Sequence, residues 1–293
     1  MKSKDIDPKV YELYDEYCHG YITRREFFRR AAKVAVGGMA AVAMANALLP
    51  RYAEAQTISF TDKRIHPTYL DYRSKRGSAR KIRAYLAAPK GPGPFPAVLV
   101  IHENRGLNPH IEDVARRFAV EGFLALAPDA LTAAGGYPGN DDDGRKMQRS
   151  LDRDKLKTDM VNAASFLKSH ELSNNKLGVT GFCWGGSVTN HIAAQLGSDV
   201  KAAVPFYGSG VDDSAVANMD TKLMVQSAET DPRINKAWPD FEASLKKYGV
   251  EHKRHVYAGT QHGFHNNSTP RYNEEAADLA WQRTVAFFRD NLT

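Results

Sequence analysis

One hexapeptide of the chain has the residues and the spacing of a covalent catalyst. Gly181-Phe182-Cys183-Trp184-Gly185-Gly186 directly follows a predicted strand over 177–180 and directly precedes a predicted helix over 184–196. Glycines flank nucleophiles in such G-x-nucleophile-x-G turns because neighbouring Cβ atoms would clash in so tight a reversal. The turn also places the thiol at a helix N-terminus, which favours the thiolate. We predict that Cys183 is a nucleophile; the alternative is a buried structural cysteine.

An acid and a histidine follow this cysteine in the chain. Asp231 lies in Ala-Glu-Thr-Asp-Pro just after a predicted strand over 223–227, and His262 lies in Gly-Thr-Gln-His-Gly-Phe after the last predicted strand, 252–257. Open parallel sheets build their sites on loops at the carboxyl ends of strands. A thiol nucleophile needs a base, and the base needs an orienting acid. We therefore predict a Cys-His-Asp triad, against the alternative of a turn aspartate and an unrelated loop histidine.

The elements that would position these residues alternate along the chain from residue 66. Short β-branched or aromatic runs are predicted strands over 68–73, 82–87, 97–102, 124–127, 177–180, 202–206, 223–227 and 252–257. Longer helical patterns lie over 110–121, 144–169, 184–196, 233–248 and 273–291. The run 97–101 is apolar on consecutive residues, which indicates a central strand buried on both faces. We predict an α/β fold with a mostly parallel sheet of about eight strands flanked by helices.

Five motifs together resemble the dienelactone hydrolase family. They are Val-Ile-His-Glu-Asn-Arg-Gly-Leu-Asn (100–108), Ala-Pro-Asp (127–129), the cysteine hexapeptide, Glu-Thr-Asp (229–231) and His-Gly-Phe (262–264). The resemblance covers residues 66 to 290 and implies an α/β-hydrolase fold. It also implies that Cys183, His262 and Asp231 hydrolyse an ester or lactone bond through an acyl-thioester, without a cofactor.

The resemblance assigns roles to three further residues near the thiol. It places Glu103 beside the cysteine, where the family's acid takes part in switching a resting thiol to an attacking thiolate. The backbone N–H groups of Asn104 and Trp184 would form the oxyanion hole, which also follows from the fold, since the hole uses the residue after the nucleophile and the loop after the third strand. The alternative for Glu103 is a plain ion pair with Arg105.

The chain departs from the family at the positions that hold a substrate carboxylate. Ala133 and Asn266 stand where the alignment of motifs leads us to expect arginines. We therefore expect the preference for an anionic dienelactone to be lost. Arg105 could supply a substitute cation, or the loop 135–141 could shape the pocket around an uncharged ester. The residues expected to contact the substrate are Arg105, Tyr137 and Phe264.

The N-terminal segment resembles a twin-arginine export signal. Residues 23–29 read Thr-Arg-Arg-Glu-Phe-Phe-Arg, and an Ala- and Val-rich stretch over 31–49 precedes Ala53-Glu54-Ala55. We predict an export signal or N-terminal extension over 1–55, a catalytic domain over 56–293, the twin-arginine export machinery as a partner, and a periplasmic location. The alternatives are a helix that stays on the protein, membrane association through an uncleaved segment, or a cytoplasmic location.

Composition excludes several other classes of protein. The chain has 293 residues, of which 42% are hydrophobic and 25% charged, as in ordinary globular proteins. The formal charge is +6, but no basic run is interleaved with aromatic residues, so nucleic acid is not an expected partner. Cys18 and Cys183 fit neither a disulfide framework nor a zinc motif, and we expect no metal.

Two other functions remain open from the sequence alone. One is a carboxylesterase or thioesterase acting on small uncharged acyl groups. The other is a catalytically silent relative that binds a ligand or senses oxidants through Cys183. The ordered acid and base favour an enzyme, because a binding protein has no need of them. The natural substrate and the oligomeric state, including whether the protein forms an oligomer, stay undetermined.

Overall fold

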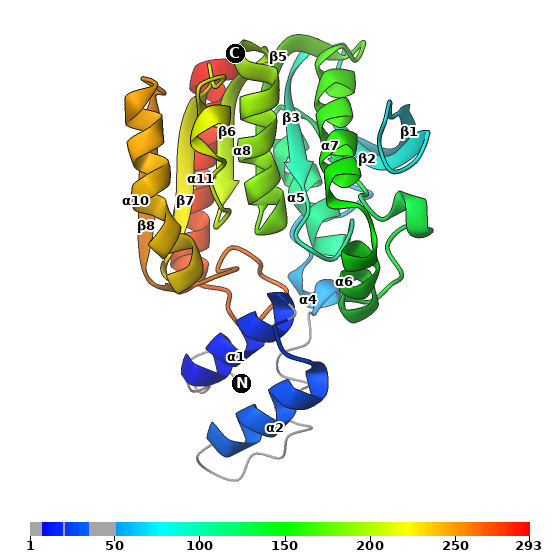
Figure 1. The fold of residues 1–293 in the computed structure, drawn as a ribbon. Helices are drawn as coiled ribbons and strands as arrows, with labels where there is room; N and C mark the ends of the chain where they lie inside the picture. Colours follow the sequence, from blue (N-terminus) through cyan, green and yellow to red (C-terminus); the bar gives the residue numbers. More distant parts are fainter. Residues whose placement is uncertain (1–7, 20, 35–50) are drawn as a thin grey trace.

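A computed structural model describes residues 8–19, 21–34 and 51–293. It comprises a small helical hairpin near the N-terminus and a larger α/β domain (Figure 1). Most of the apolar stretch of the predicted export signal lies outside the described residues. The alanines of its expected cleavage site belong to the short helix α4 (Tyr52–Ala55).

An eight-stranded sheet forms the centre of the α/β domain. Its strands are β1 (Ile65–Arg73), β2 (Lys81–Pro89), β3 (Phe95–Ile101), β4 (Leu124–Pro128), β5 (Ser173–Phe182), β6 (Val200–Phe206), β7 (Lys222–Thr230) and β8 (His252–Gln261). The strand order is β1-β2-β4-β3-β5-β6-β7-β8, with β1 and β2 antiparallel to their neighbours and the others parallel. Every predicted strand is present, and the sequence-based prediction of a mostly parallel sheet is confirmed.

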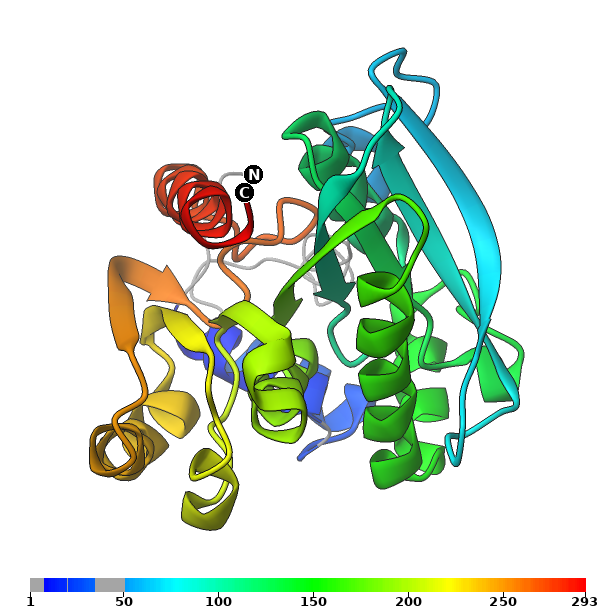
Figure 2. The ribbon, with the colours of Figure 1, turned by 90° about the horizontal axis from the view of Figure 1, so that it is seen from above.

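Helices cover both faces of the sheet and bury an apolar cluster on each. The larger helices are α5 (Pro109–Val120), α6 (Asp141–Ser150), α7 (Arg153–Lys168), α8 (Trp184–Leu196), α10 (Pro232–Lys247) and α11 (Glu274–Leu292), and a short helix α9 spans Asp213–Val216. Figure 2 shows α5 and α11 on one face and α7, α8 and α10 on the other. The strand β3 lies between β4 and β5, and residues 97–101 are fully buried, as its apolar run predicts. Because helices bury both faces of the sheet, the carboxyl ends of its strands, where the candidate site lies, are held in place.

The predicted helix over 144–169 is wrong in one respect, because the chain forms two helices there. Helix α6 ends at Ser150 and α7 begins at Arg153. Asp152 starts the second helix: its carboxylate accepts hydrogen bonds from the N–H groups of Asp154 (3.0 Å) and Lys155 (3.2 Å). The spacing of charged residues typical of a helix continues from α6 into α7. For this reason the sequence analysis did not recognise Asp152 as an N-cap.

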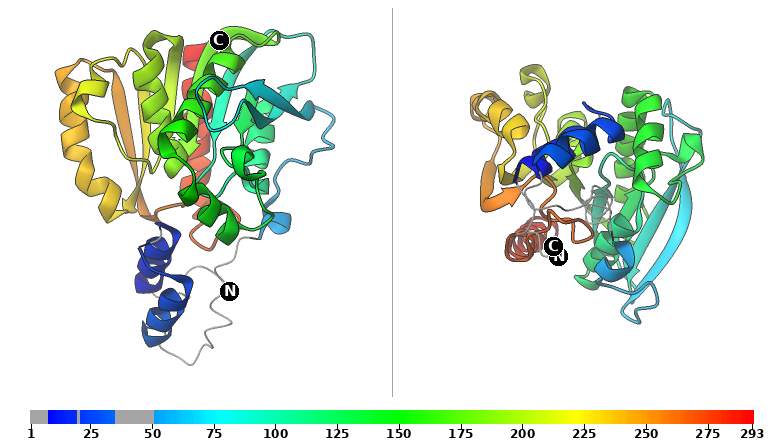
Figure 3. Two further views of the ribbon diagram at one scale, coloured as in Figure 1. Left: turned by 45° about the vertical axis from the view of Figure 1, so that its right-hand side comes forward. Right: turned by 90° about the horizontal axis from the view of Figure 1, so that it is seen from below.

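The N-terminal hairpin consists of α1 (Pro8–His19) and α2 (Arg24–Val34), which pack on each other through a small core of Val10, Tyr14, Phe27 and Ala31. It lies beyond the carboxyl ends of the strands and beside α6 (Figures 1 and 3). Arg145 of α6 donates a hydrogen bond to the Tyr17 carbonyl (3.2 Å), and its guanidinium lies 4.4 Å from the Tyr17 ring centre. Within the described ranges, no helix is long and apolar enough to span a membrane.

Candidate active site

Cys183 occupies the sharp turn between β5 and α8. Its φ of 56° lies in the left-handed region, which is strained for a residue with a Cβ. Gly185 allows the turn to pack directly on the end of β3, because a Cβ there would lie only 2.3 Å from the Ile101 carbonyl oxygen. On the other side, the Cys183 N–H donates to the Phe206 carbonyl (3.1 Å). The position of Cys183 is therefore fixed by backbone contacts with both neighbouring strands.

The two residues predicted to form the oxyanion hole come from two different segments. Trp184 begins α8, and Asn104 belongs to the loop that follows β3. Both line the same cavity as Cys183. The Trp184 ring stacks on the His102 ring with 5.3 Å between centres, and the His102 Nε2 accepts a hydrogen bond from the Ala130 N–H (3.1 Å). These contacts hold the β3 loop against the start of α8.

Asp231 and His262 form a buried hydrogen bond, as their predicted pairing requires. The distance between His262 Nδ1 and Asp231 Oδ2 is 2.6 Å, and the side chains are 5% and 2% exposed. Asp231 also caps α10, because its other oxygen accepts from the Ile234 N–H (3.3 Å). An ionised Asp231 is an acceptor, so the proton of a neutral His262 belongs on Nδ1 and leaves Nε2 as the basic nitrogen.

Tyr207 is a site residue that the sequence analysis missed. It is buried, has a φ of 38°, and its ring centre lies 4.9 Å from that of His262. Burial raises the pKa of Tyr207 well above its usual value, and the negative charges of Glu103 and Cys183 add to the effect. Its position directly after the predicted strand 202–206 was the available signal, since loops after parallel strands carry sites.

Glu103 is buried close to a group of cations. Burial by itself would raise the pKa of Glu103, but the positive charges of Arg105, His110 and Arg271 outweigh it and hold that pKa below its ordinary value. Asn266, which replaces one expected arginine, donates a hydrogen bond to Glu103 Oε2 (3.1 Å). Glu103 is therefore an ionised acceptor at neutral pH.

Arg105, expected to contact the substrate, is instead buried between two carboxylates. Its Nη1 lies 2.8 Å from Asp141 Oδ2, and its Nε lies 3.9 Å from Glu103 Oε2. The alternative of a Glu103–Arg105 ion pair is thus present in the structure. Its side chain is 2% exposed and is not among the described residues that line the Cys183 cavity, and its expected role as a substrate contact stays a prediction.

The other two expected substrate contacts also lie outside that cavity. Phe264 is fully buried in the core against Tyr207 and Tyr257, so it presents no surface to a ligand. The Tyr137 hydroxyl donates to Asp141 Oδ1 (3.0 Å), and its ring lines a separate cavity next to α6. The expected roles of both residues as substrate contacts stay predictions.

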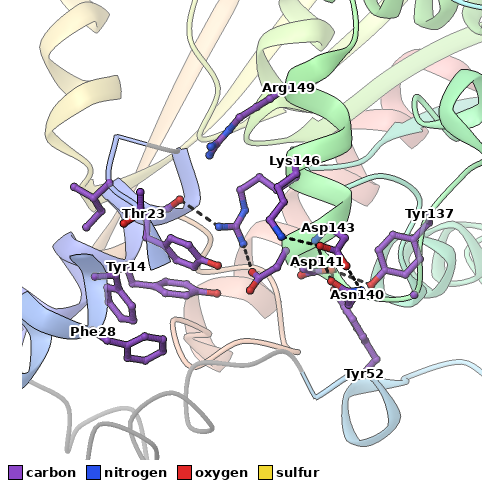
Figure 4. Close-up of a pocket in the computed structure, with 16 residues that line it drawn as sticks. Tyr14, Thr23, Phe28, Tyr52, Tyr137, Asn140, Asp141, Asp143, Lys146 and Arg149 are labelled. Carbon is purple, nitrogen blue, oxygen red and sulfur yellow. Dashed lines mark hydrogen bonds and ion pairs between the residues drawn. The ribbon is translucent and has the colours of Figure 1, made fainter. Parts of the chain in front are cut away.

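Two neighbouring cavities lie at this end of the sheet. The first, of about 330 Å³, is lined by Tyr21, Asn104, Arg145, Gln148, Arg149, Arg153, Leu156, Lys157, Cys183, Trp184, Ser187 and Arg233. The second, of about 700 Å³, lies between the hairpin and α6 and is shown in Figure 4. Arg145 and Arg149 line both. The hairpin contributes Tyr21 to the cavity that contains the thiol.

The part of the chain that the structure describes contains no group of three or more His, Cys, Asp or Glu side chains placed to hold a metal ion. The groups gathered at the strand ends are instead a thiol, an imidazole and a carboxylate. Such a set is suited to nucleophilic acyl transfer.

The sheet topology, the strained turn and the buried His-Asp pair define an α/β-hydrolase. Residues 82–292 match the family described as "Dienelactone hydrolase family", and residues 1–34 match one described as "YqhI-like". The chain belongs to the dienelactone hydrolase family and is a hydrolase acting on ester or lactone bonds.

Individual relatives agree with this family assignment. The chain is 53% identical over 115 residues to "Putative hydrolase fragment YghX" of Escherichia coli K12, covering 39% of this chain and 97% of that protein. It is 30% identical to a "Putative carboxymethylenebutenolidase" of Saccharolobus solfataricus, covering 71% of this chain and 94% of the relative. A "Putative Dienelactone Hydrolase" structure from Klebsiella pneumoniae aligns with a TM-score of 0.66 and 28% identity, covering 76% and 98% of the two chains.

Proposed function

We propose that this hydrolase uses Cys183 as a covalent nucleophile, His262 as its base and Asp231 as the orienting acid. The observation that carries the proposal is the buried hydrogen bond of 2.6 Å between His262 and Asp231, at the same end of the sheet as a thiol in a strained turn. A structural cysteine would not need an oriented imidazole nearby. Small-molecule carboxylic esters and lactones are the proposed substrates.

The proposed reaction passes through an acyl-thioester. His262 Nε2 accepts the thiol proton while the sulfur of Cys183 forms a bond to the carbonyl carbon. The resulting oxyanion accepts hydrogen bonds from the N–H groups of Asn104 and Trp184. Collapse of this intermediate breaks the C–O bond, and the imidazolium returns its proton to the departing alkoxide. Water, deprotonated by His262, then cleaves the thioester, and the thiolate regains a proton.

We propose a second, weaker role for Glu103 as a positioning residue. Its charge lies near both Tyr207 and Arg105, and Asn266 orients the carboxylate. Glu103 and Cys183 both raise the pKa of Tyr207 through their charge, and a carboxylate in the neighbourhood of a thiol opposes thiolate formation in the free enzyme. A Glu103→Gln variant should therefore shift the pH dependence of Cys183 alkylation to lower pH, which a merely structural residue would not do.

The decisive experiment compares Cys183→Ala with Cys18→Ala, which removes the other cysteine of the chain. On a panel of short esters, lactones and a dienelactone, Cys183→Ala should reduce kcat by about a thousandfold or more, since members of a triad act as a unit. Cys18→Ala should retain wild-type turnover. Wild-type hydrolysis by Cys183→Ala would overturn the proposal. Detection of a covalent acyl adduct on the Cys183 peptide by mass spectrometry would support it directly.

The N-terminal segment has two proposed fates. The paired arginines at 24 and 25 support export by the twin-arginine machinery to the periplasm, and α2 begins at the first of them. The packing of Tyr17 against Arg145 and the match of residues 1–34 to a family of its own support a segment that stays on the protein. We propose export on the strength of the arginine pair, with retention of the hairpin as the alternative.

A further inference from the structure

One tyrosine from the N-terminal side of the catalytic domain contacts the oxyanion loop, residues 103–108, which includes the proposed oxyanion donor Asn104. Tyr52 begins the short helix α4, and its hydroxyl donates a hydrogen bond to Asp141 Oδ1 (2.6 Å; Figure 4). The same hydroxyl accepts a hydrogen bond from Asn108 Nδ2 (2.9 Å). Tyr52 lies between the two segments of the chain that match known families. Family membership therefore assigns it no role.

The Tyr52 hydroxyl and the Asp141 carboxylate together connect two points of the oxyanion loop. Near the start of the loop, Arg105 Nη1 donates to Asp141 Oδ2 (2.8 Å). At its end, Asn108 Oδ1 accepts from the Ile111 N–H (3.2 Å) and caps α5, while the amide nitrogen of the same side chain donates to Tyr52. A continuous chain of hydrogen bonds thus runs from Arg105 through Asp141 and Tyr52 to Asn108.

This chain of hydrogen bonds is shielded from water. Arg105, Asn108 and Asp141 are buried, and Tyr52 is half-buried. Burial alone would raise the pKa of the Asp141 carboxyl, but the charge of Arg105 and the hydroxyls of Tyr52 and Tyr137 outweigh it and hold that pKa below its ordinary value. Asp141 is therefore a carboxylate at neutral pH. Hydrogen bonds to a buried ionised acceptor are stronger than those between neutral groups in water, so they restrict the loop.

The backbone on both sides of Tyr52 is held by the loop that follows β8. The Arg51 N–H donates to the Ser268 carbonyl (2.8 Å), and the Asn267 side-chain amide donates to the Ala55 carbonyl (2.8 Å). These contacts fix the start and the end of α4 against the catalytic domain. The Tyr52 hydroxyl is therefore held in position by its own segment, independently of the hydrogen bonds that it makes.

We propose that Tyr52 is a positioning residue for the oxyanion loop, whose conformation it fixes so that the Asn104 N–H is aimed at the oxyanion that forms during hydrolysis. The inference rests on the proposed function in taking Asn104 as an oxyanion donor. Preorganised donors stabilise the transition state only when their position is exact, and a misplacement of about 1 Å can cost about a hundredfold in rate. Loss of the Tyr52 hydroxyl should therefore lower kcat and leave KM nearly unchanged.

The first test compares Tyr52→Phe with Tyr248→Phe in the full-length protein, with a short neutral ester as substrate. Each substitution removes one hydroxyl that donates to a carboxylate, because the exposed Tyr248 donates to Asp213 Oδ2 (3.0 Å). Tyr52→Phe should lower kcat about ten- to hundredfold and change KM less than about twofold. Tyr248→Phe should keep both wild-type values. An unchanged kcat in Tyr52→Phe, or an equal loss in the control, would overturn the proposal.

Asn108→Ser interrupts the same chain of hydrogen bonds from its other side. Serine keeps an oxygen that can cap α5 but lacks the amide that donates to Tyr52. Because both substitutions break one connection, the double variant should lose no more kcat than the more affected single variant. Losses that multiply would contradict a shared role. Should urea unfolding show that Tyr52→Phe does not fold, Asn108→Ser decides alone: a lower kcat at unchanged KM supports the proposal, and a wild-type kcat overturns it.

Two reagents that react with the thiol separate an oxyanion defect from other defects. Butanal forms a thiohemiacetal with Cys183, in which the sulfur bonds to the carbonyl carbon and the thiol proton ends on the oxygen that the oxyanion donors would hold. Iodoacetamide alkylates the same sulfur with loss of iodide and forms no oxyanion. Tyr52→Phe should weaken inhibition by butanal about ten- to hundredfold and leave the rate of alkylation within about twofold of wild type. An equal loss with both reagents would overturn the assignment to the oxyanion loop.

Failure of this inference can be told apart from failure of the proposed function. Wild-type turnover by Cys183→Ala would refute the proposed nucleophile. Any other nucleophile attacking the same carbonyl would still need the oxyanion donors, so the comparison of kcat between Tyr52→Phe and Tyr248→Phe would remain decisive. Conversely, a wild-type kcat in Tyr52→Phe would overturn the role of Tyr52 and leave the Cys-His-Asp triad as proposed.

Discussion

Asp231→Asn is the substitution that tests the proposed triad most sharply. The amide has nearly the same size as the carboxylate and keeps an oxygen that can accept the N–H of Ile234, now 3.3 Å from Asp231 Oδ1. The cap of α10 should therefore survive. What changes is the partner of His262 Nδ1, which loses a buried negative charge 2.6 Å away. The substitution isolates the electrostatic role of the acid from its structural role.

The size of the effect follows from that geometry. With the charges about 5 Å apart, centre to centre, and an effective dielectric constant of about 20, the carboxylate stabilises the imidazolium by roughly 3 kcal/mol. This corresponds to a factor of about 200 in kcat. An asparagine that donates to Nδ1 would also reverse the tautomer and could extend the loss to about ten-thousandfold. The free energy of unfolding should change by less than about 1 kcal/mol, because the cap is retained.

The assay is the steady-state hydrolysis of a neutral ester, with urea unfolding of the same samples. Asp240→Asn is the matched control, because it makes the same chemical change at an exposed position of the same helix. We expect normal kcat from the control and a loss of a hundredfold or more from Asp231→Asn. A variant that is folded and keeps more than a tenth of the wild-type kcat would refute the reasoning.

Three further predictions follow from other parts of the structure. Gly185→Ala should lower the free energy of unfolding by about 1 to 3 kcal/mol in urea titrations and reduce kcat, because its Cβ would overlap the Ile101 carbonyl; unchanged stability would contradict the packing. Glu103→Gln should be less stable than wild type at pH 7. The depressed pKa of Glu103 means that its contribution is present above the ordinary value of 4.5 and is lost as pH falls through the folded pKa, so the two stability curves should converge below pH 4.5. Replacing Arg24 and Arg25 with lysines should abolish periplasmic accumulation in a bacterial host measured by fractionation, and unaltered accumulation would argue against twin-arginine export.

The fold was predictable because short stretches of sequence identify its strands without reference to the rest of the chain. The run 97–101 is apolar on every residue, a Gly- and Pro-rich segment precedes it, and His102 and Glu103 follow it. The break between α6 and α7 was not anticipated, since Arg149, Arg153 and Lys157 continue a four-residue spacing through it. Only the side chain of Asp152 marks the new helix start, and an aspartate among charged residues is a weak signal.

The candidate site was predictable to a lesser depth. Cys183, Asp231 and His262 stand directly after strands, and a parallel sheet brings such positions to one edge. The surroundings of the other expected site residues were not predictable in this way. Whether Arg105 faces a cavity or a buried Asp141 depends on packing between segments 36 positions apart, which neither local spacing nor residue type reports.

Export with removal of the hairpin of α1 and α2 would give the chain two chemically different forms. While it is attached, Tyr21 forms part of the boundary of the Cys183 cavity and Tyr17 covers one side of Arg145. Cleavage after Ala55 would remove both aromatic rings and leave the Cys183 cavity more open to water. The precursor would then be selective for slender molecules, and the processed enzyme would accept bulky ones. The size of the substrates that are hydrolysed would then report whether the hairpin has been removed. This could be measured in a cell extract without separating the two forms.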